Sequence, residues 1–206
     1  MYKLFASPAT ASLAVHWMLI ELGVPFDLEK LDFGRREQKS AAYLQLSPAG
    51  VVPTLIVDGQ PVTETGAILM LLAERHPELG FAPPLGTIER ADWLRYMVWL
   101  ANGPMATFRL WFYPDDLPGI DRDAIRARIE NYWNHVDLRL ASRSHMVGGQ
   151  ITTVDFQLTM LMRWSRKMPK PATSWPNIAA YLKAMRARPG LREVHAREGI
   201  TDWIDD

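Results

Sequence analysis

The chain has 206 residues, of which 48% are apolar and 22% are charged, and cysteine is absent. Its 23 basic and 23 acidic side chains balance, so the overall charge gives no reason to expect binding to nucleic acid or to an anionic membrane. Without cysteine the chain has no disulfide, no thiolate metal site and no cysteine nucleophile. The five histidines are scattered without metal-ligand spacing, and we expect no metal.

The beginning of the chain shows no apolar run with a cleavage site, and no stretch of about 18 apolar residues occurs anywhere. We therefore expect no signal peptide, no membrane span and a cytoplasmic location.

Short apolar runs alternate with helical patterns in the first part of the chain. Gly23 is a helix stop, Asp58-Gly59 is a hairpin turn, and Pro77 ends a third helical pattern. The expected order is β-α-β-α-β-β-α, with strands at 2–6, 25–31, 53–57 and 61–63 and helices at 11–22, 39–46 and 65–76. A βαβ unit followed by a ββα unit predicts a sheet with helices on both faces.

A segment rich in proline and glycine, residues 77–87, separates this part from a helical remainder. We expect a first domain at 1–78, a linker at 79–87 and an all-α domain at 88–206. The helices predicted there cover 88 to about 113 with a bend at Gly103-Pro104, 121–141 with Asp121 as its cap, 152–168, 175–187 and 191–196.

Four segments together resemble the glutathione transferase family, most of all its bacterial beta and theta-like members. They are LFASPATASLAVHWMLIELGVPF, SPAGVVPTL, VTETGAILMLLAERHP and the Thr152–Asp155 stretch TTVD. The resemblance implies an α/β thioredoxin-like N-terminal domain that holds glutathione as co-substrate. It also implies an all-α C-terminal domain that shapes the pocket of a second, hydrophobic and electrophilic substrate, and a homodimer.

Glutathione conjugation needs a thiolate, and an unperturbed thiol has a pKa of about 8.5. A helix N-terminus and a hydroxyl that donates to sulfur both lower that pKa. The turn before the first helix offers three hydroxyls, and we rank Thr10 first, Ser12 second and Ser7 third as the activating group. The position of the beta-class cysteine falls on Ala11, which is a departure from the family. The alternative is that Thr10 only caps the helix.

The resemblance also implies where the rest of glutathione binds. The Val52-Pro53 bond is expected to be cis, so that Val52 presents its backbone to the cysteinyl unit; an edge-strand proline with a trans bond is the alternative. Glu64 is expected to pair with the ligand's ammonium, while Thr65 and the free N–H groups of its helix bind the γ-glutamyl carboxylate.

The glycine carboxylate of glutathione needs a cation or a donor. Lys39 and Gln38 lie where the family places this group, with Arg35 and Arg36 as competitors on the same loop. A solvated Lys39 with no ligand is the simpler interpretation.

For the second substrate we expect the first long helix of the C-terminal domain to provide Asn102, Phe108 and Arg109. An aromatic run at helical spacing is more often core than pocket, so part of it must be packing. Thr152 and Asp155 have the spacing of a capping box and predict a helix start.

The function that these residues predict is an enzyme that attacks an electrophilic, mostly apolar small molecule with the thiolate of glutathione. A glutathione-dependent disulfide or peroxide reductase is one alternative. A non-catalytic binding module is another, because no tyrosine or cysteine stands in the first turn.

Overall fold

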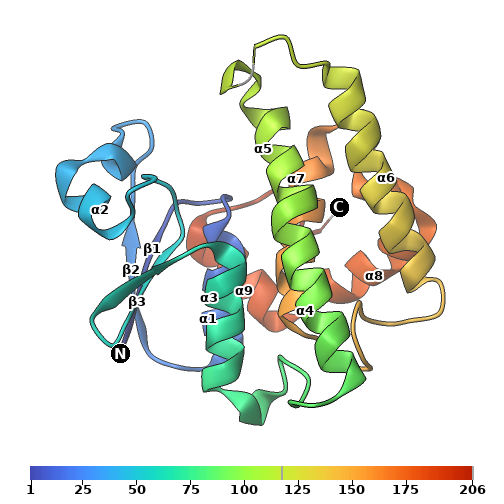
Figure 1. Ribbon diagram of the computed structural model, residues 1–206, viewed down its shortest axis with the longest axis horizontal. Helices are drawn as coiled ribbons and strands as arrows, with labels where there is room; N and C mark the ends of the chain where they lie inside the picture. Colours follow the sequence, from blue (N-terminus) through green and yellow to red (C-terminus); the bar gives the residue numbers. More distant parts are fainter. Residues whose placement is uncertain (117, 206) are drawn as a thin grey trace. The chain divides into compact units, whose positions relative to one another are not determined.

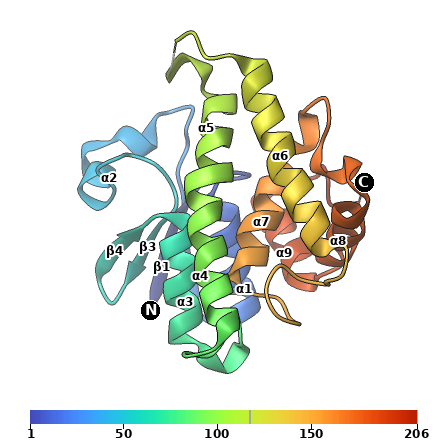
Figure 2. The ribbon, with the colours of Figure 1, turned by 45° about the vertical axis from the view of Figure 1, so that its right-hand side comes forward.

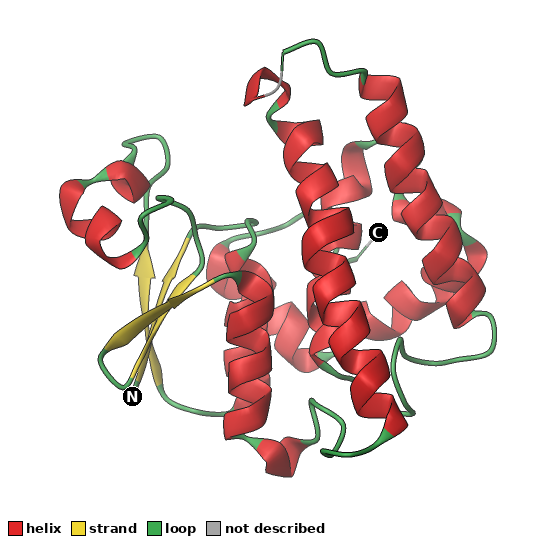
Figure 3. Cartoon of the chain, in the orientation of Figure 1, coloured by secondary structure: helices red, strands yellow, loops and turns green. Residues whose placement is uncertain are grey.

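The computed structural model describes residues 1–116 and 118–205. These form two compact units, one of Met1–Leu79 with Ala187–Asp206 and the other of Gly80–Arg186 (Figure 1). The sequence predicts a linker at 79–87 and one helical domain at 88–206, whereas this division places residues 80–87 in the second unit and the last twenty residues in the first. The strands of the described residues, drawn in yellow in Figure 3, all lie within residues 2–63 and therefore in the first unit.

The first unit is built on a four-stranded mixed sheet in the order β2-β1-β3-β4. Its strands are β1 (Tyr2–Ala6), β2 (Phe26–Lys30), β3 (Thr54–Val57) and β4 (Gln60–Thr63). β1 runs parallel to β2 and antiparallel to β3, and β3 pairs with β4 through the expected hairpin (Figure 2). The element order β-α-β-α-β-β-α is confirmed.

Four helices complete the first unit: α1 (Ser12–Leu22), α2 (Ala41–Leu46), α3 (Thr65–Arg75) and α9 (Pro189–Glu198). In α1 every residue is buried except Ile20 and Glu21, because β1, α3 and α9 all pack against it. A helix that is apolar around its whole circumference needs such cover on several sides. Gly23 ends α1 in the left-handed conformation, as predicted.

The second unit is helical, with α4 (Ile88–Leu100), α5 (Ala106–Phe112), α6 (Arg122–Leu140), α7 (Thr153–Trp164) and α8 (Pro176–Arg186). Trp93, Phe108, Trp133 and Phe156 are fully buried in its core. Asp121 caps α6 with its carboxylate, as predicted, accepting from two backbone N–H groups.

The bend expected near Gly103-Pro104 takes the form of a π-helical turn, Ala101–Met105, between α4 and α5. Pro104 has no N–H to give to the preceding turn, which explains why the α-helical hydrogen bonding is interrupted there. Just after this turn, the Thr107 hydroxyl donates back to the Gly103 carbonyl at 2.9 Å.

Other boundaries differ from the predicted ones by a few residues. The helix expected at 39–46 begins at Ala41, after a separate 3₁₀ turn at Glu37–Lys39. The α-helix expected at 152–168 ends at Trp164 and continues as a 3₁₀ turn. The last helix, expected at 191–196, is longer and spans Pro189–Glu198.

The predicted capping box starts α7. The Asp155 carboxylate accepts from the Thr152 backbone N–H at 2.8 Å and from the Tyr181 hydroxyl at 3.0 Å. No helix in the described part of the chain combines the length and the apolar composition that a bilayer crossing needs.

Candidate functional site

The sheet register brings three expected binding segments to one end of the first unit. Phe5 on β1 pairs with Thr54 on β3, and Thr54 pairs with Thr63 on β4. Since β3 runs antiparallel to both neighbours, the end of β1, the start of β3 and the end of β4 lie together. The turn after β1, the proline before β3 and the residues after β4 therefore meet at this end.

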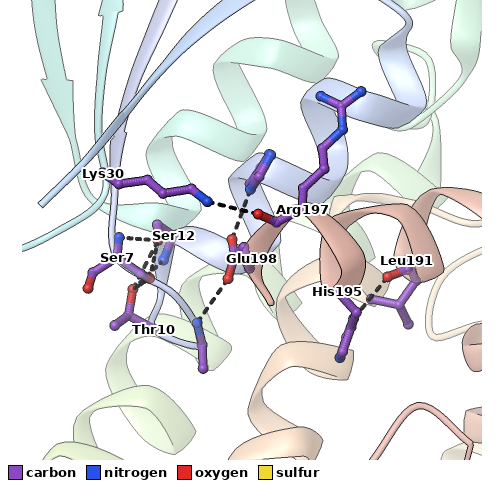
Figure 4. Close-up of polar contacts among 10 residues, drawn as sticks. Ser7, Thr10, Ser12, Lys30, Leu191, His195, Arg197 and Glu198 are labelled. Carbon is purple, nitrogen blue, oxygen red and sulfur yellow. Dashed lines mark hydrogen bonds and ion pairs between the residues drawn. The ribbon is translucent and has the colours of Figure 1, made fainter. Parts of the chain in front are cut away.

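The turn after β1 is held by a small hydrogen-bond cluster (Figure 4). The Thr10 Oγ1 donates to the Ser7 carbonyl at 2.7 Å, and the Ser12 Oγ lies 3.1 Å from the same oxygen. The two hydroxyls are 2.9 Å apart, and the Ser12 Oγ also accepts from the Ser7 N–H at 3.2 Å. The Thr10 hydroxyl contacts the Ser12 N–H only at 3.4 Å, so it closes the turn more than it caps α1.

These contacts use the protons of two of the three candidate hydroxyls. Thr10 and Ser12 have one hydroxyl proton each, and both are directed at Ser7 or at each other. Ser12 is fully buried. By contrast, the Ser7 hydroxyl has no hydrogen-bond partner within residues 1–116 and 118–205.

Two residues at this end have an unusual backbone. Ala9, in the turn, has φ 62°, and Glu64, after β4, has φ 69°. The left-handed region is unfavourable for residues with a Cβ, and such residues gather at functional sites. The Ala9 N–H donates to the Glu198 carboxylate at 2.9 Å, which places the C-terminal end of α9 behind the turn.

The Val52-Pro53 bond is cis, as the resemblance implies. The segment before it is anchored by Tyr43 of α2, whose hydroxyl donates to the Val51 carbonyl at 2.8 Å and lies 2.8 Å from the Thr54 Oγ1. Burial raises the pKa of Tyr43, against the opposite effect of its hydrogen bond with Thr54, so the phenol stays protonated and able to donate at neutral pH.

Sequence reasoning missed Tyr43, because one aromatic residue on a short helix indicates only a core position. Its distance of eight residues from the carbonyl that it binds gives no local signal.

Lys39 and Gln38 lie against the turn that leads to Val52. The Lys39 Nζ donates to the Ala49 carbonyl at 2.8 Å and remains exposed to solvent. The Gln38 Oε1 is buried and has no partner among the described residues. Gly50, with φ 60°, sits directly beside both residues.

Thr65 begins α3 at the same end. Thr65 is buried, and its hydroxyl has no hydrogen-bond partner in the described part of the chain. The preceding Glu64 is exposed, and its side chain does not cap the helix. The first N–H groups of α3 therefore remain available to an anion.

Family models for the N-terminal and C-terminal domains of glutathione S-transferases match residues 1–74 and 106–198. The chain belongs to the glutathione S-transferase family. It is a glutathione transferase by sequence and by fold, with a thioredoxin-like first unit and a helical second unit.

Similar proteins span almost the whole chain. Glutathione S-transferase GstA of Escherichia coli O157:H7 is 29% identical over 200 residues, covering 96% of this chain and 99% of the relative. The uncharacterized GST-like protein YncG of Escherichia coli K12 is 30% identical over 213 residues, covering 97% and 100%. A sphingomonad glutathione S-transferase solved in complex with glutathione is 30% identical, with a TM-score of 0.85 and coverage of 97% and 100%.

The residues of this transferase that we expected to face a second substrate belong to the second unit and differ in exposure. Asn102 and Arg109 are exposed, and the Arg109 guanidinium lies 4.8 Å from the centre of the Tyr113 ring. Phe108 is fully buried, with the rings of Phe112, Trp133 and Trp164 around it. Packing therefore accounts for Phe108.

Within the described residues, no group of three or more acidic or histidine side chains is arranged to hold a metal ion. Ala11, at which we expected the beta-class cysteine position, is the residue before α1 and has no functional group in its side chain.

Proposed function

We propose that this transferase ionises the thiol of glutathione and transfers the sulfur to an electrophilic, mostly apolar small molecule. One observation carries the proposal: the buried Thr65 hydroxyl has no partner among the described residues, at a helix start beside the turn that holds the candidate activating groups. A buried hydroxyl without a hydrogen-bond partner costs free energy unless a ligand supplies that partner.

The γ-glutamyl end of glutathione fits the start of α3. Its carboxylate would accept from the Thr65 hydroxyl and from the first N–H groups of the helix, where the dipole favours an anion. The exposed carboxylate of Glu64 would then pair with the ammonium of the γ-glutamyl residue of glutathione.

The other end of the tripeptide fits the Gln38–Lys39 turn. Lys39 gives one N–H to Ala49 and keeps two for the glycine carboxylate. The buried Gln38 Oε1 is an acceptor, so it suits a peptide N–H of the ligand. Between the two ends, Val52 and the adjacent Pro53 would present backbone groups to the cysteinyl unit.

We assign the activating hydrogen bond to the Ser7 hydroxyl, ahead of Thr10 and Ser12. Thr10 would have to give up its 2.7 Å bond to the Ser7 carbonyl, and Ser12 is enclosed by the protein. A charge-assisted hydrogen bond contributes about 1.5–3 kcal/mol. At about 1.4 kcal/mol per pKa unit, it lowers the pKa of a thiol by about one to two units.

The test is an ultraviolet titration of bound glutathione, which follows the absorbance of the thiolate against pH. The wild type should show a thiol pKa below that of free glutathione. Ser7→Ala should raise this pKa by about one to two units, whereas Ser12→Ala should lower stability and leave the pKa nearly unchanged. Thr10→Ala tests the alternative that the Thr10 hydroxyl donates to the sulfur.

A shift confined to Thr10→Ala would move the assignment to that hydroxyl. An unshifted thiol in the wild type would remove the mechanism, and binding without ionisation would favour a carrier of glutathione. Failure to bind glutathione at all would favour the non-catalytic module.

For the second substrate we propose Asn102 and the exposed Arg109 as contacts, on the family resemblance and their exposure.

We also propose that two copies of the chain associate in a cytoplasmic homodimer. Leu94 and Val98, four residues apart on α4, are exposed apolar side chains that support a contact surface. Analytical ultracentrifugation tests the dimer.

A further inference from the structure

Glu198, the last residue of α9, connects that helix to the turn that carries the candidate activating hydroxyls (Figure 4). Its Oε2 accepts from the Ala9 N–H at 2.9 Å, and its Oε1 lies 2.9 Å from the His16 Nδ1 in α1. The Glu198 side chain is 2% exposed and that of His16 is fully buried. The chemistry proposed above uses neither side chain.

The chemistry of the pair defines its hydrogen bonds. A carboxylate can only accept, so with Glu198 in its carboxylate form the donor of this hydrogen bond is the His16 Nδ1. The His16 Nε2 is buried and has no partner in the described part of the chain. Both oxygens of Glu198 are therefore engaged, one by α1 and one by the turn.

Of these two contacts, the hydrogen bond from the Ala9 N–H to Glu198 is the one that affects the backbone conformation of the turn. Ala9 has φ 62°, a conformation that costs a residue with a Cβ about 1–2 kcal/mol. Its N–H is held by Glu198, while Thr10 follows it directly and Ser7 lies two residues before it. A change in the backbone at Ala9 would therefore redirect the hydroxyls on either side.

A second ion pair fastens the other end of α9 to α1. Arg188 donates to both oxygens of Glu21, at 3.1 and 2.8 Å. This contact joins the same two helices without touching the Ser7–Thr10 turn. It provides an internal comparison that separates the docking of α9 from the positioning of the turn.

We propose that Glu198 is a positioning residue, whose carboxylate fixes the backbone of the Ser7–Thr10 turn and thereby directs the hydroxyl that would face the thiol of glutathione. The proposal rests on the proposed function, since it concerns the site at which that thiol would be ionised. Glu198 itself lies behind the turn and acts only through it.

Two substitutions separate position from charge. Glu198→Gln removes the charge but keeps the reach: its amide oxygen can accept from Ala9, and its NH₂ can donate to His16 once the imidazole proton moves to Nε2. Glu198→Asp keeps the charge but is shorter by one methylene, about 1.5 Å, and it cannot hold both contacts at once. Glu21→Asp makes the same shortening at the opposite end of the helix pair.

The measurement is the thiol pKa of bound glutathione in each variant, with thermal stability alongside. Positioning predicts that Glu198→Asp raises the pKa by about one unit, which is about a tenfold change in the ionisation constant. Glu198→Gln and Glu21→Asp should both stay near the wild type. Thermal stability is expected to fall in several of these variants, so it does not decide whether Glu198 positions the turn.

The other outcomes overturn the proposal. A fall in the thiol pKa in Glu198→Gln alone would show a simple charge effect, because removing a nearby anion favours the thiolate. Equal shifts in Glu198→Asp and Glu21→Asp would show that only the docking of α9 matters. A wild-type thiolate with no response to Glu198→Asp ends this proposal alone, whereas a wild type without a thiolate ends the proposed function and this proposal with it.

Discussion

At the scale of single residues, Gly50 shows how closely the expected carboxylate-binding loop is packed. A Cβ at this position would lie 2.7 Å from the Gln38 carbonyl oxygen and 2.8 Å from the Lys39 Nζ. Gly50 also has φ 60°, which glycine adopts without cost. Any side chain at position 50 would therefore meet both a steric clash with Gln38 and Lys39 and an unfavourable backbone conformation.

We expect Gly50→Ala to destabilise the protein by about 2–3 kcal/mol, of which about 1–2 kcal/mol is the left-handed backbone. It should also weaken glutathione binding, because the Gln38–Lys39 turn must move. Urea unfolding and calorimetric titration with glutathione measure the two effects.

Gly59→Ala is the matched control for this substitution. Gly59 has φ 80°, but a Cβ there meets nothing within 4 Å, so only the backbone penalty applies. If Gly59→Ala weakens glutathione binding as much as Gly50→Ala does, the loop around Lys39 is not part of the binding site.

The sequence was sufficient to name the residues that converge at the end of the sheet, but not to rank the hydroxyls among them. Ser7, Thr10 and Ser12 all stand in one turn, so sequence position treats them alike. Which proton is free depends on the partners of each oxygen and on the enclosure of Ser12, and both arise only from the folded turn.

At the scale of elements, most boundaries follow from local signals such as Gly23, Asp58-Gly59 and the Thr152–Asp155 box. The last helix, predicted at 191–196, is two residues longer at each end. Proline is favoured in the first turn of a helix, and Gly199 adopts the left-handed conformation that ends one. Those two signals together mark the observed bounds.

Asp92 connects α4 and α6 inside the second unit. Its carboxylate accepts from Arg95, in its own helix, and from Arg139 of α6. Burial alone would raise the pKa of Asp92, but the hydrogen bonds and charges of Arg95 and Arg139 outweigh it and hold the pKa below its usual value. The ion pair therefore stabilises the folded state wherever Asp92 is ionised.

We expect Asp92→Asn to cost about 1 kcal/mol at pH 7, since the carboxylate is partly exposed and its interactions are screened. A lowered folded-state pKa contributes stability that is present above the unfolded pKa of about 3.9 and is lost as the pH falls below it. The difference between wild type and variant should therefore shrink on acidification.

Urea unfolding at pH 7 and at pH 3 checks both parts of this prediction. Glu193→Gln, which removes an exposed pair with Arg197 within one helix, is the control and should change stability less. A cost that is the same at both pH values would point to packing instead of the ion pair.

At the scale of the whole molecule, the first unit is discontinuous in sequence. Residues 187–206 associate with α1 through Glu21–Arg188 and His16–Glu198. Their helical pattern predicts that they belong to the helical domain at 88–206, because contacts between distant segments leave no local pattern in the sequence. The one available signal was α1 itself, whose apolar residues occupy all sides and need more cover than a sheet and one helix provide.

A chain that ends at residue 186 should lose the stable first unit. It would expose one side of α1 and leave the buried His16 without its acceptor, and buried polar groups without partners are costly. Thermal unfolding and glutathione binding are the measurements.

A chain that ends at residue 199 keeps α9 and both ion pairs, and loses only the terminal segment in which Trp203 stacks on His195. It should fold and bind with a modest loss of stability. Equal behaviour of the two truncated chains would show that α9 contributes little to the first unit.

The discontinuity also affects the order of events during protein synthesis. A ribosome releases the chain from its N-terminus at about 5–20 residues per second, so the sheet emerges early and waits until all of Gly80–Arg186 has been made. Only then does α9 reach α1 and bring Glu198 to Ala9. The first unit therefore cannot make all its contacts until residues 187–198 have been synthesised, and a stalled chain that lacks them has no carboxylate to accept from the Ala9 N–H.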